Sequence, residues 1–190
     1  MNPWASIWFH PRQTIRQIVD TNPRHLVLPL AVGIGATNLV WQSLFVASKR
    51  NLSIPLAMVV AAGFGALFGI LGLYLFGWVY RWVGSWLGGQ ATNVQVRAAI
   101  AWPRVPLLAA CAISLMVSLV SVQSGAAEPL LPFLVTLIGT WWSFVLLCHT
   151  LGEVHGFSAW KGLATQLIPA IIVIIPIFLA VSLPYFLRGH

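Results

Sequence analysis

The stretch that decides the fold is PLAMVVAAGFGALFGILGLYLFGWVY, which runs from Pro55 to Tyr80 without a charged residue. A bilayer core about 30 Å thick is crossed by roughly 20 apolar residues of helix, because each helical residue rises about 1.5 Å. This stretch is long enough to cross, and Pro55 suits the first turn of a helix. It therefore predicts a membrane-spanning helix.

Four other stretches share this length and apolar character, which predicts five spans in all. They cover about residues 26–46, 106–122, 130–151 and 163–187, so that residues 55–80 form the second span. The fifth contains three prolines, which a membrane helix tolerates because neighbouring groups satisfy the freed carbonyls. The predicted fold is all-α, a polytopic membrane protein with one domain over residues 1–190.

The composition excludes a water-soluble globular protein, because hydrophobic residues make up 59% of the chain and charged residues only 7%. The formal net charge is +7, but the basic residues are dispersed at the ends of the predicted spans. They form no patch that would bind nucleic acid, and they are placed to contact anionic lipid headgroups. We therefore expect membrane lipids as partners and no nucleic acid.

The distribution of Lys and Arg predicts the orientation of the protein in the membrane, because the positively charged segments that flank membrane spans are retained on the cytoplasmic side. With the amino terminus inside, the cytoplasmic segments hold Arg12, Arg16, Arg24, Arg81, Arg97, Arg104 and Lys161. The outer side then holds Lys49, Arg50 and Arg188. We expect a multi-pass protein of the bacterial inner membrane, with its amino terminus in the cytoplasm and its carboxyl terminus outside.

Residues 1–24 predict amphipathic helices that lie in the cytoplasmic interface. Asn2 and Pro3 form a helix cap and a first-turn proline, and a second start is expected at His10 and Pro11. Tryptophans favour headgroup depth, and arginines face phosphates. The segment either anchors the amino terminus or forms a surface for lipid or a partner.

A second cytoplasmic helix is predicted between the second and third spans. Gly88 and Gly89 end one helix, Thr92 or Asn93 caps the next, and two prolines break it before the third span. With the amino-terminal segment, it supplies the predicted lipid or partner surface: Trp4, Trp8, Arg12, Arg16, Arg97, Trp102 and Arg104.

Two stripes of small residues predict close helix packing. The stripe on the second span contains Ala61, Gly65, Gly69 and Gly72, and the stripe on the third contains Ala110, Ser114 and Ser118. Either the two stripes pack on each other inside one molecule, or the Gly65 and Gly69 pair forms a seam between two copies.

Few polar groups inside the spans suggest chemistry. Asn38 and Gln42, four residues apart, are expected to hydrogen-bond to another helix or to line a lipid or solute cavity. His149, Glu153 and His155 are weak candidates for a metal site, and the alternative is that Glu153 pairs with Lys161 or a cytoplasmic arginine. We assign no metal and no cofactor.

Catalysis is poorly supported. No Asp, Glu, Lys or Arg lies at the centre of a predicted span, although ionisable groups there usually mark a functional path. The sequence contains no His-Glu-x-x-His, Gly-x-Ser-x-Gly or phosphate-binding glycine loop. We therefore expect a protein that is not an enzyme.

Several segments together resemble bacterial members of the Yip1 family. They are Asn2-Pro3-Trp4 with residues 11–16, residues 77–80 leading to Gly88-Gly89, the run AAIAWPRVP at residues 98–106, and His155-Gly156-Phe157-Ser158. The resemblance implies five spans and a cytoplasmic amino terminus. Eukaryotic members act in vesicle traffic, associate with Rab-type GTPases and form oligomers, but this chain has neither their longer amino-terminal region nor their Asp-Leu-Tyr-Gly-Pro type motif. Rab binding is therefore not carried over.

These observations predict a non-enzymatic membrane scaffold or adaptor of Yip1 type that organises lipid or protein partners, with a homo-oligomer or another membrane protein among them. The alternative is a lipid or small-solute permease, including a scramblase, that uses the Asn38 and Gln42 face. A third class, a metal-dependent enzyme, requires a metal bound by His149, Glu153 and His155.

Overall fold

The computed structural model describes residues 2–50, 52–123 and 130–172, and all regular structure in these ranges is helical. The elements are α1 (Pro3–Ser6), α2 (Pro11–Thr21), α3 (Val27–Lys49), α4 (Ile54–Trp86), α5 (Asn93–Ala101), the 3-10 helix η1 (Trp102–Arg104), α6 (Val105–Gln123) and α7 (Leu130–His155). Residues 159–172 are also helical.

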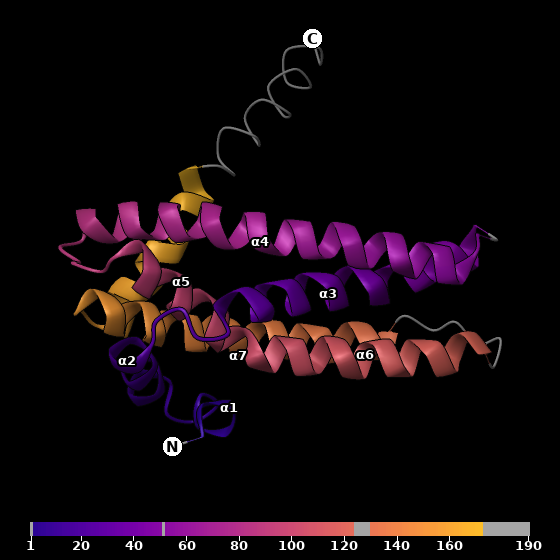
Figure 1. Cartoon of the computed structure of the whole chain (residues 1–190), viewed down its shortest axis with the longest axis horizontal. Coiled ribbons are helices and arrows are strands. Elements are labelled where there is room, and N and C mark those ends of the chain that lie inside the picture. Colours follow the sequence, from indigo (N-terminus) through magenta and orange to yellow (C-terminus); the bar gives the residue numbers. More distant parts are fainter. Residues whose placement is uncertain (1, 51, 124–129, 173–190) are drawn as a thin grey trace, which may run out of the picture.

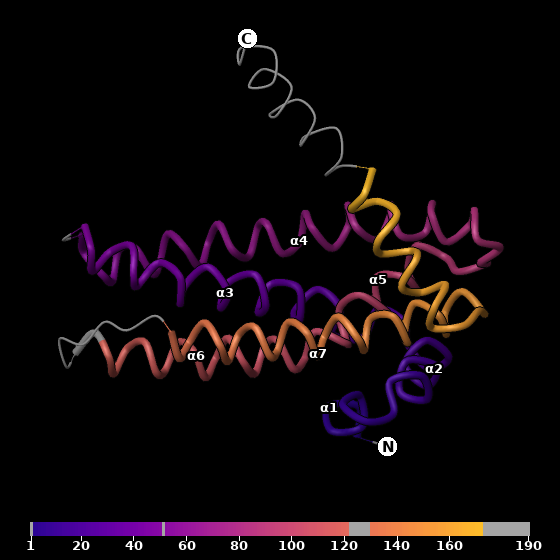
Figure 2. The backbone as a smooth tube through the Cα atoms, turned by 180° about the vertical axis from the view of Figure 1, so that it is seen from behind, coloured from indigo at the N-terminus to yellow at the C-terminus, as the bar shows by residue number. Residues whose placement is uncertain are grey.

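Four long helices run side by side along the long axis of the molecule (Figure 1). α3 packs on α4 and on α6, and α6 packs on α7. α4 and α7 therefore lie on the two outer sides of this group. The short helices α1, α2 and α5 gather at one end, which we call the α5 end, and the view from behind shows the same arrangement (Figure 2).

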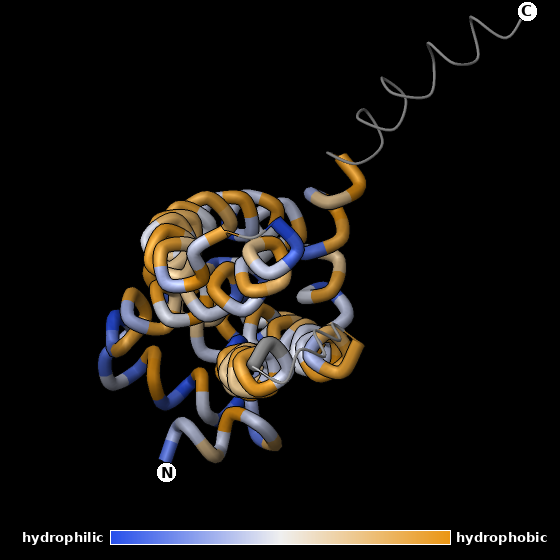
Figure 3. Tube along the Cα trace, turned by 90° about the vertical axis from the view of Figure 1, so that its right-hand side faces the viewer, coloured by the Kyte–Doolittle hydropathy of each residue, from blue (hydrophilic) through white to orange (hydrophobic). Residues whose placement is uncertain are grey.

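Four helical segments are long and apolar enough to cross a membrane: Val27–Lys49, Ile54–Trp86, Asn93–Ser121 and Leu130–His155. They confirm the predicted all-helical membrane protein. The long helices consist largely of apolar residues (Figure 3), and many of their large apolar side chains are exposed. Of the predicted fifth span, the structure describes only residues 163–172, and the rest lies outside the described residues.

α4 and α7 are longer than the predicted spans, and each ends beside a glycine with left-handed backbone and not at the end of its apolar run. α4 continues past Tyr80 to Trp86, just before Gly88 with its φ of 88°. α7 continues to His155 and stops at Gly156, whose φ is 75°. Only glycine adopts this conformation at little cost, and it commonly ends helices.

The predicted helix between the second and third spans is α5, and its cap is confirmed. The Thr92 hydroxyl accepts a hydrogen bond from the Gln95 amide at 3.4 Å, and the Gln95 side chain accepts one from the Thr92 amide at 2.8 Å. However, α5 does not lie on a surface. It is a central element, since Val96, Ala98, Ala99, Ile100 and Ala101 are all buried.

The predicted contact between the two small-residue stripes is wrong, because each stripe packs on a different helix. On α4, Gly65 and Gly69 lie against the backbone of α3 at Gly35 and Ala31. On α6, the Ser114 hydroxyl donates to the Pro132 carbonyl of α7 at 2.9 Å. The small residues of α3 explain this choice, since two glycine-containing faces allow the closest approach of backbones.

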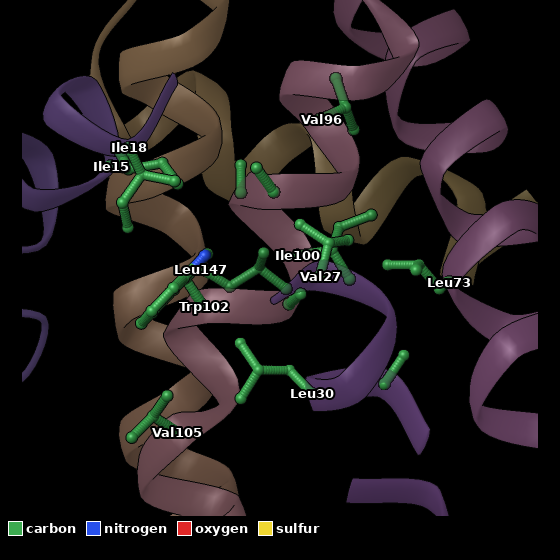
Figure 4. Close-up of a cluster of buried hydrophobic side chains, with 14 of the residues drawn as sticks. Ile15, Ile18, Val27, Leu30, Leu73, Val96, Ile100, Trp102, Val105 and Leu147 are labelled. Carbon is green, nitrogen blue, oxygen red and sulfur yellow. The ribbon is translucent and has the colours of Figure 1, made fainter. Parts of the chain in front are cut away.

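An apolar core lies at the α5 end, where side chains from α2, α3, α4, α5 and α7 meet (Figure 4). Ile15 of α2 and Ile100 of α5 are fully buried in it. The amino-terminal segment therefore belongs to the same packed unit as the spans.

Candidate functional site

The α5 end contains most of the residues predicted to form a functional surface, and α2 is packed on it. Its apolar side packs on α7 and α5, with Ile15 and Ile18 buried. The sequence predicted an amphipathic helix in the membrane interface, and the structure shows that protein covers the apolar side of this helix. The polar side of α2 remains exposed, at Gln13 and Gln17 among others.

An ion pair holds α2 on α7. The Nε of Arg16 donates to Oε1 of Glu153 at 2.6 Å, and a second guanidinium nitrogen contacts the same oxygen. Arg12 lies 4.0 Å from the other carboxylate oxygen and also donates to the Phe157 carbonyl at 3.5 Å. Arg12 and Arg16 therefore contact α7 and the turn after it, and only their exposed sides remain available to lipid or a partner.

Trp102 was predicted to lie on the surface, and the structure places it in the interior, fully buried. Its indole N–H donates to the His25 carbonyl at 3.2 Å, and its ring stacks on the His25 ring at 6.1 Å. Trp4 packs edge-on against it at 5.4 Å while staying 43% exposed, and Trp8 is half-buried against the core. Trp102 is thus the base on which the amino-terminal segment rests.

The three weak metal candidates do not converge. Glu153 is occupied by Arg16, and His155 is buried between Gly84 and Gly89 with its ring stacked on Phe157 at 5.1 Å. Among the described residues, no group of three or more His, Cys, Asp or Glu is placed to hold a metal ion. The pairing of Glu153 with an arginine was the alternative in the sequence, and the partner is Arg16.

Arg97 lies beside the ring of Tyr74 on α4, with its guanidinium carbon 4.6 Å from the ring centre. Its Nε donates to the Asn93 carbonyl at 3.1 Å. Gly77 makes room for its stem, since a Cβ there would lie 2.8 Å from Arg97 Cγ. With Arg24, it lines a cavity of about 390 Å³ at the α5 end, where it stays accessible to an anionic group.

A larger hollow, which we call the groove, is lined by α3, α4 and α7, with Arg104 of η1 and Leu107 of α6. Its volume is about 480 Å³, within the range of ligand pockets. Its lining is formed by Ala31, Ile34, Gly35, Asn38, Leu39, Gly65, Phe68, Gly69, Gly72, Phe76, Arg104, Leu107, Thr140, Ser143, Phe144 and Leu147. Mostly apolar side chains and glycines thus surround a few polar groups.

The polar groups of the groove differ in how they are satisfied. Asn38 accepts a hydrogen bond from Gln42 on the same helix at 2.5 Å, and the described residues show no bond from either side chain to another helix. Asn38 lines the groove, whereas Gln42 is exposed outside it. Thr140 and Ser143 are hydrogen-bonded to backbone groups. Arg104 lines the groove, and among the described residues no carboxylate lies within ion-pair distance of it.

The sequence reasoning assigned Arg104 to an outer surface and missed the groove. Two features of the sequence point to the groove. Gly35 allows the first span to pack closely on the glycines of the second span. Arg104 stands directly before the third span, with no acidic residue nearby in the sequence. Gly72, predicted to pack against a helix, faces the groove, because a Cβ there would meet only Phe76 of its own helix at 3.9 Å.

Comparison with known protein families gives one match, in which the Yip1 domain covers residues 5–181, nearly the whole chain. The chain belongs to the Yip1 family. The comparisons with curated proteins and with solved structures give no significant match. The Yip1 domain and the four long apolar helices together establish a multi-pass membrane protein, as predicted from the sequence. The docked α2, the buried Trp102 and the groove all lie within this Yip1 domain.

Proposed function

We propose that this Yip1 protein is a non-enzymatic scaffold or adaptor of the bacterial inner membrane, which presents the layer formed by α1 and α2 to an acidic protein partner. The observation that carries the proposal is the docking of α2. Its apolar side is buried on α7 and α5, and Arg16 binds Glu153. An amino-terminal segment fixed in this way forms a rigid surface, which recognition favours because little ordering is needed on binding.

The chemistry of the layer favours an acidic partner. Arg12 and Arg16 of α2 and Arg24 just after it are exposed, and Asp20 is an exposed carboxylate of α2. Phe9 is 76% exposed and Trp4 43%, so the same surface offers aromatic side chains that anchor interfaces well. Electrostatic complementarity would bring the partner in, and the aromatic anchors would hold it.

The proposal places the α5 end in the cytoplasm. Arg12, Arg16, Arg24, Arg81, Arg97, Arg104 and Lys161 belong to the elements at this end, whereas the turn after α3 at the far end carries Lys49 and Arg50. Positive residues flanking spans are retained inside. The groups that the proposal needs are then on the side where cytoplasmic partners are found.

Site-specific photo-crosslinking in intact cells tests the proposal. A photoreactive amino acid at Gln13 is expected to give one discrete crosslinked product, and the same group at Leu52, exposed at the far end of the bundle, is the control. Charge reversal by Arg24→Glu, at an exposed arginine that has no ion pair among the described residues, should remove the product without reducing the amount of protein in the membrane. Equal products from both positions, or none from Gln13, would contradict the proposal.

A lipid permease or scramblase is the second candidate, because membrane-spanning helices line the groove. Its lining ends near Asn38 and Gly65, whereas α3 continues to Lys49, about 16 Å further at the rise of a helix. A groove that stops short of the far end favours binding over passage. Lipid transfer in reconstituted vesicles distinguishes a scramblase from a protein that only binds lipid. Transfer of labelled lipid faster than in vesicles without the protein would favour the scramblase.

A further inference from the structure

The groove has the depth of one membrane leaflet. Along α4 its lining extends from Phe76 to Gly65, eleven residues, or about 16 Å of helix. Half of a bilayer core about 30 Å thick is roughly the same length. Phe76 and Arg104 mark the α5 end of the groove, and Asn38 and Gly65 mark its deep end. A membrane lipid whose headgroup lies at the α5 end would therefore have its acyl chain along the groove.

The groove has space because four glycines line it, and a glycine has no side chain to fill it. Gly35, Gly65, Gly69 and Gly72 line it together, and the first three bring α3 and α4 into backbone contact. Gly72 is different, because a Cβ at this position would reach only the ring of Phe76 and no other helix. The space in front of Gly72 is therefore not used to pack α4 on α3. It is lined by Phe68, Phe76 and Phe144, which suit a hydrocarbon chain.

Arg104 gives the groove one charged end. A guanidinium stays ionised, and a charge taken from water is costly unless a counter-charge or hydrogen-bond acceptors surround it. Two carboxylates lie in the described part of the chain: Glu153 binds Arg16, and Asp20 is exposed on α2. Neither lines the groove. No carboxylate of the described residues therefore supplies a counter-charge to Arg104, and the phosphate of a lipid is an anion that a guanidinium fork matches well.

We infer that the groove lined by α3, α4 and α7 binds one anionic phospholipid of the leaflet at the α5 end, with its phosphate on Arg104 and an acyl chain along Phe76, Gly72 and Phe68. The charged group and the apolar channel are continuous, which fits an amphiphile and not a free anion. This inference is independent of the proposed partner surface, since none of the groove residues belongs to α1 or α2.

The test measures lipid bound to the purified, delipidated full-length protein by native mass spectrometry, with phosphatidylglycerol and phosphatidylcholine as probes. The wild type is expected to bind one phosphatidylglycerol in preference to phosphatidylcholine. Arg104→Gln should weaken phosphatidylglycerol binding at least about tenfold, the usual loss for a hydrogen bond to a charged group. Gly72→Leu should fill the channel and weaken the binding of both lipids.

Each variant has a matched control. Arg50→Gln removes an exposed arginine at the far end of the bundle, and Gly63→Leu adds the same side chain to α4 where a Cβ would meet nothing. Both controls should bind lipid as the wild type does. Thermal melting of every variant establishes that a loss of binding is not a loss of fold.

Three results would overturn the inference. The first is equal phosphatidylglycerol affinity of Arg104→Gln and Arg50→Gln. The second is displacement of the lipid by millimolar inorganic phosphate, which would make the site one for a free anion. The third is a dimer that Gly72→Leu disrupts while lipid binding stays unchanged, which would assign the groove to a second copy of the chain.

Discussion

Arg16 and Glu153 are 137 positions apart in the chain, and the guanidinium Nε of Arg16 donates to Oε1 of Glu153 at 2.6 Å. The whole sequence contains only three acidic residues, and this one ties the amino-terminal segment to the end of α7. The pair adds a polar contact to the apolar packing of α2 on α7. Loss of this pair should therefore destabilise α2 more than it destabilises the spans.

Replacement of the carboxylate by Glu153→Gln should loosen α2. A partly exposed ion pair contributes up to about 1 kcal/mol, so amide exchange over residues 11–21 should become about fivefold faster while exchange in α3 and α6 is unchanged. Hydrogen exchange followed by mass spectrometry measures this. Asp20→Asn, which removes an exposed carboxylate of α2 that has no ion pair in the described ranges, is the control.

The double variant Arg16→Gln with Glu153→Gln separates the pair from its surroundings. If the two groups act on each other, the second substitution adds little to the first, and the coupling shows as non-additivity. Fully additive effects, or exchange in α2 that the Asp20→Asn variant changes as much, would show that the ion pair does not hold the helix.

Trp102→Ala should destabilise the whole protein, because it empties a fully buried site and removes the surface on which Trp4 and His25 pack. Losses of about 3–5 kcal/mol are usual for such a truncation. Trp160→Ala is the matched control, since Trp160 is 81% exposed. Thermal unfolding in detergent should separate the two clearly. Similar melting temperatures for both variants would contradict the assignment of Trp102 to the core.

The sequence predicted the membrane class, the four long apolar helices, the short helices α1, α2 and α5, and the Thr92 cap, because these depend on local composition. Apolar length identifies a span wherever the chain goes, and Thr92 bonds to Gln95 only three residues away. The fold class and the family match followed from the same signals. The sequence did not indicate which face of each helix packs on which neighbouring helix.

Those pairings could not be predicted, because they depend on distant residues. The amphipathic α2 has one apolar side whether lipid or protein covers it, and only the fold shows that α7 and α5 do so. Trp102 resembles an interfacial tryptophan in sequence, yet its bond to the His25 carbonyl spans 77 positions. The groove likewise arises where α3, α4 and α7 meet, which no single stretch encodes.

Gly65→Leu should prevent α3 and α4 from packing. A Cβ at Gly65 would overlap the backbone of Gly35 and lie 2.8 Å from Ala36 Cα, and a backbone cannot move aside as a side chain can. The cost of such overpacking is about 1–3 kcal/mol or more. Folded yield should fall sharply by size-exclusion chromatography, whereas Gly63→Leu, on the open side of the same helix, should behave as the wild type.

The same chromatograms decide between internal packing and a seam between copies. Internal packing predicts loss of folded protein with no change in the oligomer size of what remains. A well-folded Gly65→Leu variant that elutes as a smaller species would show instead that the Gly65 face joins two molecules.

The orientation of the bundle can be read from cysteine labelling. Gln13→Cys places a thiol on exposed α2, and Leu52→Cys places one at the far end, while native Cys111 and Cys148 are buried and should react little. With the α5 end in the cytoplasm, a membrane-impermeant maleimide should label only the Leu52→Cys variant in spheroplasts, and both variants once the membrane is opened. Labelling of the Gln13→Cys variant alone in intact spheroplasts would invert the topology, and would then place the Arg104 end of the groove in the outer leaflet.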